Sequence, residues 1–174
     1  GFDFEKDGYH TSDNDNGIYF RPETGNTILI GSEDPKCDQQ EWIENPDDYN
    51  DQITESQWKA QVYRCARRIP DLKVPSRSRG VVDLYDVSDD WIPIYDKSVL
   101  GGFYMAIGTS GNQFKNAPVA GHCMAELIDA CEKGHDHDFD PLKVKTVYTG
   151  LELNMGFYSR NRKINPNSSF SVNG

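Results

Sequence analysis

Positive charge is scarce in this chain of 174 residues. Lys and Arg number 18 against 28 Asp and Glu, which gives a formal net charge of −10 at pH 7. This shortage argues against nucleic acid or an anionic membrane as a partner, because phosphate binding needs concentrated Lys and Arg. Long apolar runs are missing too, and none approaches the ~20 residues of a membrane span. We therefore expect a soluble protein without a membrane span.

Three sequence patterns are also absent. The four cysteines (Cys37, Cys65, Cys123 and Cys131) have no CxxC spacing, so we expect reduced thiols and a cytoplasmic location. No signal-peptide pattern of a basic and then an apolar region opens the sequence. Nowhere does a GxGxxG fingerprint follow a strand, so the chain shows no dinucleotide-binding unit of that kind.

The most informative stretch that is present covers residues 102–134. Its first part, residues 103–107, is apolar and unbroken, which favours a strand buried on both faces. A glycine-rich turn follows. Gly108 and Gly111 can take positive φ angles, and they leave no side chain between the backbone and an approaching group. The pattern predicts a strand that leads into a tight turn.

A long helix is predicted after this turn. Pro118 is tolerated only in the first turn of a helix, so the helix should begin near Asn116, and Gly134 should end it. Lys115 would add positive charge to the helix N-terminus, which attracts anionic groups. An ordinary strand–turn–helix corner explains the same glycines equally well. The apolar residues of the helix fall at helical spacing and predict one buried stripe: Ala117, Ala120, Met124, Leu127 and Cys131.

Three further elements are predicted. Residues 17–31 read as a β-hairpin with turn chemistry at residues 23–26. Thr54 and Gln57 form a capping box for an amphipathic helix over residues 55–68. Residues 81–86 alternate like a strand, and residues 91–96 return the chain.

The two ends of the sequence carry weaker signals. Residues 1–16 read as a polar loop. His135 and His137 alternate with aspartates in a loop, but adjacent ligands without further spacing are weak evidence, so we predict no metal site. The segment from residue 135 to 174 is expected to pack back on the body.

Three stretches carry a resemblance to a known family. GTSGNQFKNAPVAG at residues 108–121 resembles the pattern GxSGxGFKxAPxxG of the D-amino acid oxidase, sarcosine oxidase and glycine oxidase family of FAD-dependent oxidoreductases. RGVVDLYDVSDDWIPIYD resembles the strand pair that precedes it there, and GIYFRPETGNTILIG resembles an earlier hairpin of that family. The three motifs stand in the family's order.

The resemblance implies an α+β fold. It would be the substrate domain, an antiparallel sheet with flanking helices that ends in the strand, glycine turn and long helix. The Rossmann part that binds FAD in the family is absent from this sequence, so we expect a C-terminal piece of a longer protein, inactive alone. We divide it into a loop (1–16), the substrate-domain and flavin-contacting segment (17–134) and a C-terminal extension (135–174).

The resemblance also implies a function, the oxidation of a C–N bond in a small amine or amino acid, sarcosine- or glycine-like, to an imine. Either oxygen or an electron carrier would accept the electrons. Lys115 would be catalytic, by stabilising negative charge, and could serve a substrate carboxylate. Tyr85 would face the substrate, although an aromatic residue packed on a strand explains it equally well. The flavin contacts would come from the turn: Gly108, Thr109, Ser110, Gly111, Asn112, Gln113, Phe114 and Lys115.

Two departures from the family pattern bear on FAD. Asp83 stands where some sarcosine oxidases carry the cysteine that attaches the flavin, so we expect non-covalent FAD, bound mainly by the missing part. Gln113 replaces a glycine of the turn, so the sequence does not predict the backbone conformation at this position. A second function class stays open at this point: a non-catalytic α+β interaction module in which the turn is merely a corner.

Overall fold

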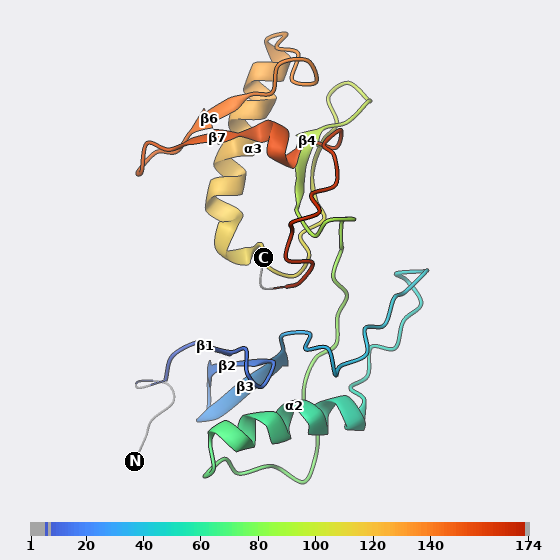
Figure 1. The fold of residues 1–174 in the computed structure, drawn as a ribbon, viewed down its shortest axis with the longest axis vertical. Coiled ribbons are helices and arrows are strands. Elements are labelled where there is room, and N and C mark those ends of the chain that lie inside the picture. The colour runs from blue at the N-terminus through green and yellow to red at the C-terminus, as the bar shows by residue number, and fades with distance from the viewer. Residues whose placement is uncertain (1–5, 7, 173–174) are drawn as a thin grey trace. The chain divides into compact units, whose positions relative to one another are not determined.

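The computed structural model describes residues 6 and 8–172, which fall into two compact units, Gly1–Leu84 and Tyr85–Gly174 (Figure 1). This division differs from the three segments expected from the sequence, because it cuts the segment 17–134 after Leu84. The predictions for residues 1–5, 7 and 173–174 lie outside the described residues. Each unit has its own core and is described by itself.

The first unit is built on a three-stranded antiparallel sheet. Its strands are β1 (Thr11–Asp13), β2 (Ile18–Glu23) and β3 (Thr27–Ser32), in that order across the sheet. The β2–β3 hairpin confirms the one predicted over residues 17–31, and Gly25 turns it at φ +74°. Strand β1 lies within residues 1–16, where the sequence predicted only a loop. It forms because it pairs with β2.

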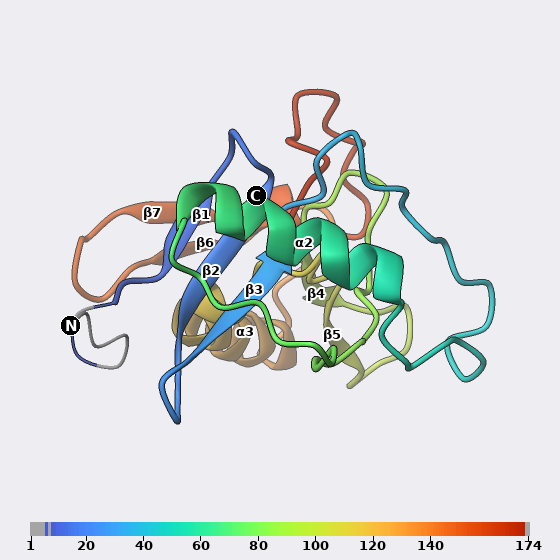
Figure 2. The ribbon, with the colours of Figure 1, turned by 90° about the horizontal axis from the view of Figure 1, so that it is seen from below.

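Helix α2 (Glu55–Arg68) packs against β2 and β3 and buries Val62 and Cys65 (Figure 2). The helix has the bounds that were predicted. The capping box was wrong in one respect: Thr54 is the N-cap residue, but its side chain makes no cap hydrogen bond.

The second unit combines two β-hairpins with one long helix. Strands β4 (Ile94–Lys97) and β5 (Tyr104–Ile107) pair antiparallel, as do β6 (Lys143–Lys145) and β7 (Glu152–Asn154). Between the hairpins come the 3-10 turn η1 (Phe114–Asn116) and helix α3 (Ala117–Glu132), and η2 (Met155–Tyr158) follows β7. The core of the unit is Tyr95, Cys123, Val144 and Met155.

The long helix agrees with its prediction. Its N-cap residue is Asn116, and the chain leaves it through Gly134 at φ +93°, whose N–H donates to the Cys131 carbonyl. Only part of the predicted stripe is deeply buried, with Leu127 fully inside and Ala120 and Met124 packed against the core.

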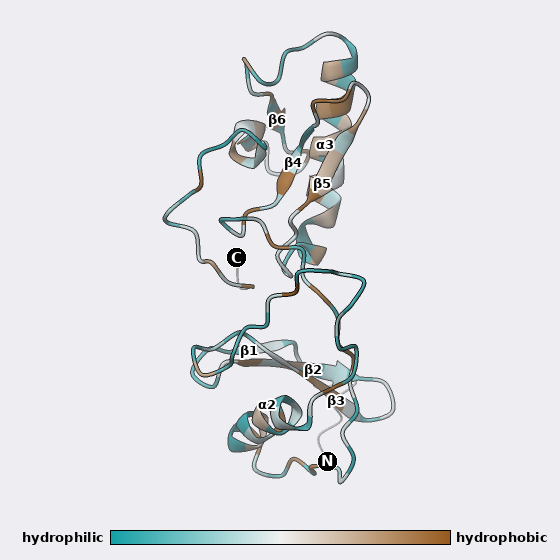
Figure 3. Cartoon of the chain, turned by 90° about the vertical axis from the view of Figure 1, so that its right-hand side faces the viewer, coloured by the Kyte–Doolittle hydropathy of each residue, from teal (hydrophilic) through white to brown (hydrophobic). Residues whose placement is uncertain are grey.

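Two strand predictions were wrong. Residues 81–86 form no strand. Strand β5 is not buried on both faces, because Phe103 just before it is 56% exposed and Ile107 at its end is 46% exposed. Among the described residues β5 pairs with β4 alone, so its other edge has no neighbouring strand (Figure 3).

The two units together form a small α+β structure with antiparallel sheets, and the described residues contain no Rossmann unit. The four cysteines are free thiols. In the described part of the chain, no helix has the length and apolar composition to cross a membrane.

Candidate functional site

The candidate site lies where residues 85–88 run beside the glycine turn at residues 108–111. Asp86 connects the two segments. Its carboxylate accepts hydrogen bonds from the N–H of Gly108 at 2.7 Å and from the N–H of Thr109 at 3.1 Å, as well as one from the Thr109 hydroxyl. The Asp86 carbonyl accepts a further bond from the N–H of Ser110 at 3.0 Å. The first three residues of the turn are therefore bonded to one residue.

Tyr85 lies directly against the turn. A Cβ added to Gly111 would come within 2.9 Å of the Tyr85 ring, closer than real Cβ atoms approach. Gly111 also has φ +77°, a region that side chains disfavour. The structure thus brings together the residue predicted to face the substrate and the turn predicted to contact the flavin.

The turn bends through three residues with positive φ. Gly108 and Gly111 account for two of them, and Ser110 at φ +51° is the third. Ser110 is fully buried, and its hydroxyl donates to the Gly108 carbonyl at 3.1 Å. A non-glycine residue in this region carries backbone strain, which persists only where its surroundings hold it.

Gln113 needs no glycine-like conformation. Its backbone has φ −91° and ψ −2°, which any residue adopts. Its side-chain oxygen accepts bonds from the Tyr95 hydroxyl at 3.0 Å and from the Asn116 amide at 3.1 Å. The departure from the family glycine therefore leaves the turn intact, and the Gln113 side chain fixes the turn to β4 and to the start of α3.

Phe114 and Lys115 lie in η1, at the N-terminal end of α3, and both side chains are exposed. The N-terminal end of a helix carries partial positive charge, although the N–H groups of Asn116 and Ala117 already donate to the Gln113 and Phe114 carbonyls. Lys115 adds a full positive charge beside them. This end of the turn can therefore receive an electron-rich or anionic group.

The two ends of the turn differ in electrostatics. Burial raises the pKa of Asp86, but hydrogen bonds from the side chain and N–H of Thr109 and from the N–H of Gly108 outweigh this, so the net pKa is lowered. Asp86 is therefore an anion at neutral pH. The negative charge of the Asp86 carboxylate therefore lies beside Gly108 and Thr109, and the positive charge of Lys115 lies at the other end of the turn.

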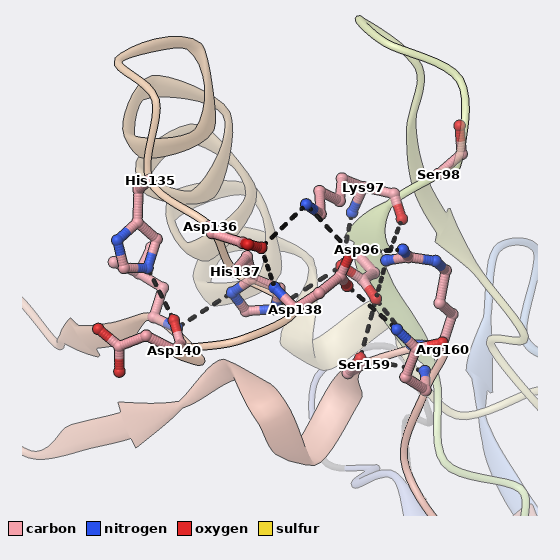
Figure 4. A network of polar contacts seen from close by, with 12 residues as sticks. Asp96, Lys97, Ser98, His135, Asp136, His137, Asp138, Asp140, Ser159 and Arg160 are labelled. Carbon is pink, nitrogen blue, oxygen red and sulfur yellow. Dashed lines mark hydrogen bonds and ion pairs between the residues drawn. The ribbon is translucent and has the colours of Figure 1, made fainter.

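A second polar cluster was missed from the sequence. Asp96 on β4 is completely buried, and its carboxylate accepts bonds from the Ser159 hydroxyl at 3.0 Å and from the N–H and guanidinium of Arg160 at 2.8 and 3.0 Å (Figure 4). Nε2 of the buried His137 lies 3.7 Å from the other carboxylate oxygen. Nearby, Arg162 binds Asp90 at 2.6 Å. The sequence gives no signal for the contacts of Asp96 with Ser159 and Arg160 or of Asp90 with Arg162, because these partners lie more than 60 residues apart.

Both histidines of the loop after α3 make hydrogen bonds to the backbone of that loop. His137 accepts the N–H of Leu142 on Nδ1 at 3.0 Å, and His135 bonds the Asp140 carbonyl at 2.8 Å. Within residues 6 and 8–172, no group of three or more His, Cys, Asp and Glu side chains is arranged to hold a metal ion. Arg21, on the central strand β2 of the first unit, pairs with Glu23 at 3.1 Å.

The comparisons with known proteins gave one match. The sequence model of a family described as FAD dependent oxidoreductase (DAO) matches residues 3–127, well over half of the 174 residues. No curated protein and no solved structure matches the chain at a significant level. The matched residues include Tyr85, Asp86 and the whole glycine turn. The chain belongs to the DAO family of FAD-dependent oxidoreductases.

Proposed function

We propose that this chain is the substrate-binding and flavin-contacting part of an oxidoreductase that oxidises the C–N bond of a small amine or amino acid, sarcosine- or glycine-like, to an imine. The observation that carries the proposal is the seating of Tyr85 on Gly111, because it joins the expected substrate residue to the expected flavin turn. Family membership favours this function over a non-catalytic interaction module. The whole enzyme would also need an FAD-binding part, and oxygen or an electron carrier as acceptor.

The residues of the turn fit a non-covalently held flavin. Gly111 has no Cβ, and the Tyr85 ring already lies in the space that a Cβ would take, so a flavin would contact the turn on a side that this ring leaves open. Asp86 already occupies the N–H groups of Gly108 and Thr109, which leaves the contacts to the second half of the turn, from Gly111 to Lys115. FAD, when bound, takes a hydride equivalent from the substrate carbon next to nitrogen. Asp83 offers no thiol for covalent attachment.

Lys115 supplies the electrostatic part of the proposal. Its side chain is exposed just before the start of α3, where the helix dipole adds partial positive charge. A reduced flavin carries more negative charge than an oxidised one, and positive groups fixed in place before the reaction stabilise that charge without reorganisation. The same ammonium group could receive the carboxylate of an amino acid substrate.

The test is Lys115→Met in the full-length protein. We expect the rate of flavin reduction by substrate, followed by stopped-flow absorbance, to fall by ~10²-fold through lost electrostatic stabilisation. Lys133→Met is the matched control, because Lys133 lies at the opposite end of α3 and pairs with Asp129 at 2.6 Å. An unchanged reduction rate in Lys115→Met would remove Lys115 from the mechanism.

A further inference from the structure

We propose that Asp86 is a positioning residue, which holds Tyr85 and the glycine turn in register and sets the charge at the flavin edge. The inference rests on the proposed function, since it names the residue that organises the same site. It follows from the four hydrogen bonds that join Asp86 to residues 108–110.

The bonds of Asp86 replace a strand ladder. Residues 85–88 form no strand, so no regular backbone pairing holds them to the turn. One carboxylate oxygen of Asp86 takes the N–H of Gly108, and the other takes both donors of Thr109. Charge-assisted bonds of this kind are about twice as strong as neutral ones. Because Tyr85 is the adjacent residue, these bonds also fix where its ring meets Gly111.

A second close contact, between Ser88 and Gly108, aligns residues 85–88 with the turn in the same way. A Cβ on Gly108 would lie 3.2 Å from the Ser88 Cβ, so the backbone of the turn approaches this segment closely at both ends. Gly111 meets Tyr85 at one end, and Gly108 meets Ser88 at the other. Asp86 lies in the sequence between Tyr85 and Ser88, so the loss of its bonds would loosen the turn between these two contacts.

The charge of Asp86 gives it a second effect. Flavin reduction adds negative charge, and an anion fixed beside the turn opposes that addition. Lys115 acts in the opposite direction from the other end of the turn. Asp86 therefore lowers the preference of the site for reduced over oxidised flavin.

Asp86→Asn separates these roles from simple packing. Asparagine keeps the size of the side chain, but it offers one carbonyl oxygen in place of two carboxylate oxygens and adds an NH₂ donor. It cannot accept the N–H groups of both Gly108 and Thr109 in the observed geometry. Asp89→Asn is the matched control, because Asp89 is an exposed aspartate three residues further along the chain.

The experiment uses the full-length protein with FAD. In Asp86→Asn we expect the affinity ratio of reduced to oxidised FAD to rise by ~tenfold, seen as a more positive midpoint potential, because an anion is removed from the site. We also expect KM for substrate to rise more than kcat falls. Asp89→Asn should change neither quantity. If Asp86→Asn binds FAD with the wild-type potential and KM, the proposal is overturned.

Amide hydrogen exchange at Gly108 and Thr109 supplies the readout that does not depend on FAD. Asp86→Asn should speed exchange at these two amides by at least ~tenfold, since their acceptor is lost. Unchanged exchange overturns the role of Asp86 even if the enzyme works as proposed. If the wild-type protein binds no FAD but the exchange effect is present, the proposed function fails while the hold of Asp86 on the turn stands.

Discussion

At the scale of single residues, the conformation of the turn decides which positions need glycine. Gly111 needs it twice over, once for its φ of +77° and once for the Tyr85 ring that lies against it. Gln113 needs it in neither way, since its backbone is in the right-handed region. The resemblance to the family pattern marked both as glycine positions, and only the backbone angles separate them.

Gly111→Ala should therefore destabilise the protein. The left-handed conformation costs a side chain ~1–2 kcal/mol, and the added Cβ would also displace the Tyr85 ring. We expect a lower free energy of unfolding by urea, and a raised KM for substrate in the full-length enzyme. Gly121→Ala is the control of opposite sign. Gly121 lies inside α3 with open space around it, so alanine should stabilise the helix by ~1 kcal/mol.

The ion pair of Asp90 and Arg162 gives a second prediction at this scale. Asp90 is 1% exposed, and the Arg162 guanidinium beside it holds the pKa of that carboxyl down to about 2. Arg162→Met would leave a buried carboxylate without its partner, which costs ~3 kcal/mol or more. Lys143→Met is the control, because its pair with Glu152 is exposed and worth under ~1 kcal/mol. Equal losses of unfolding free energy in the two variants would contradict this account.

At the scale of elements, the segment after α3 is part of the second unit. It supplies Met155 and Val144 to the core, and Arg160 and Arg162 to the buried aspartates of the β4 region. The family match ends at residue 127, so these contacts join matched residues to residues outside the match. That residues 135–174 are a C-terminal extension packing on the body of the full-length protein stays a prediction.

His137 should make the stability of this unit depend on pH. Burial lowers the pKa of His137, and although Asp96 and Asp138 raise it and His135 and Lys97 lower it further, the net pKa is lowered. Protonation would also place a proton on Nδ1, which now accepts the N–H of Leu142.

The sign follows from the depressed pKa. An unfolded histidine has a pKa of ~6.5, so the contribution of His137 is complete above that pH. It is lost as pH falls from there through the lower folded pKa. Urea unfolding of the wild type should show a declining free energy below that pH, with a smaller decline in His137→Gln. Parallel curves of unfolding free energy against pH for the two proteins would contradict this prediction.

The elements differ in how far the sequence could predict them. Both ends of helix α2 were predicted correctly, because the spacing of its apolar residues, the N-cap residue Thr54 and the basic residues of its last turn indicate the same bounds. The strand at residues 81–86 was predicted from alternation and from the resemblance to the family's strand pair. In the structure the carboxylates on that stretch bond backbone N–H groups instead, Asp83 that of Leu84 and Asp86 those of the turn. A strand also requires a neighbouring strand, which local pattern cannot supply.

At the scale of the whole molecule, the family motifs are shared between the two units. The hairpin motif forms β2 and β3 of the first unit, while Tyr85 and the glycine turn belong to the second. The sequence predicted the site through resemblance, which named Tyr85, Lys115 and the turn. It could not predict Asp86 as the connection between them, because the bonds span 22 or more residues and depend on the tertiary fold.

The absorbance spectrum of the full-length protein, as purified, tests the central claim most directly. We expect yellow flavin bands that bleach when the correct N-methyl or primary amino acid is added, because the substrate passes its electrons to FAD. The amino acid that bleaches them would also begin to define the substrate. A colourless protein that neither retains nor takes up added FAD would contradict the account.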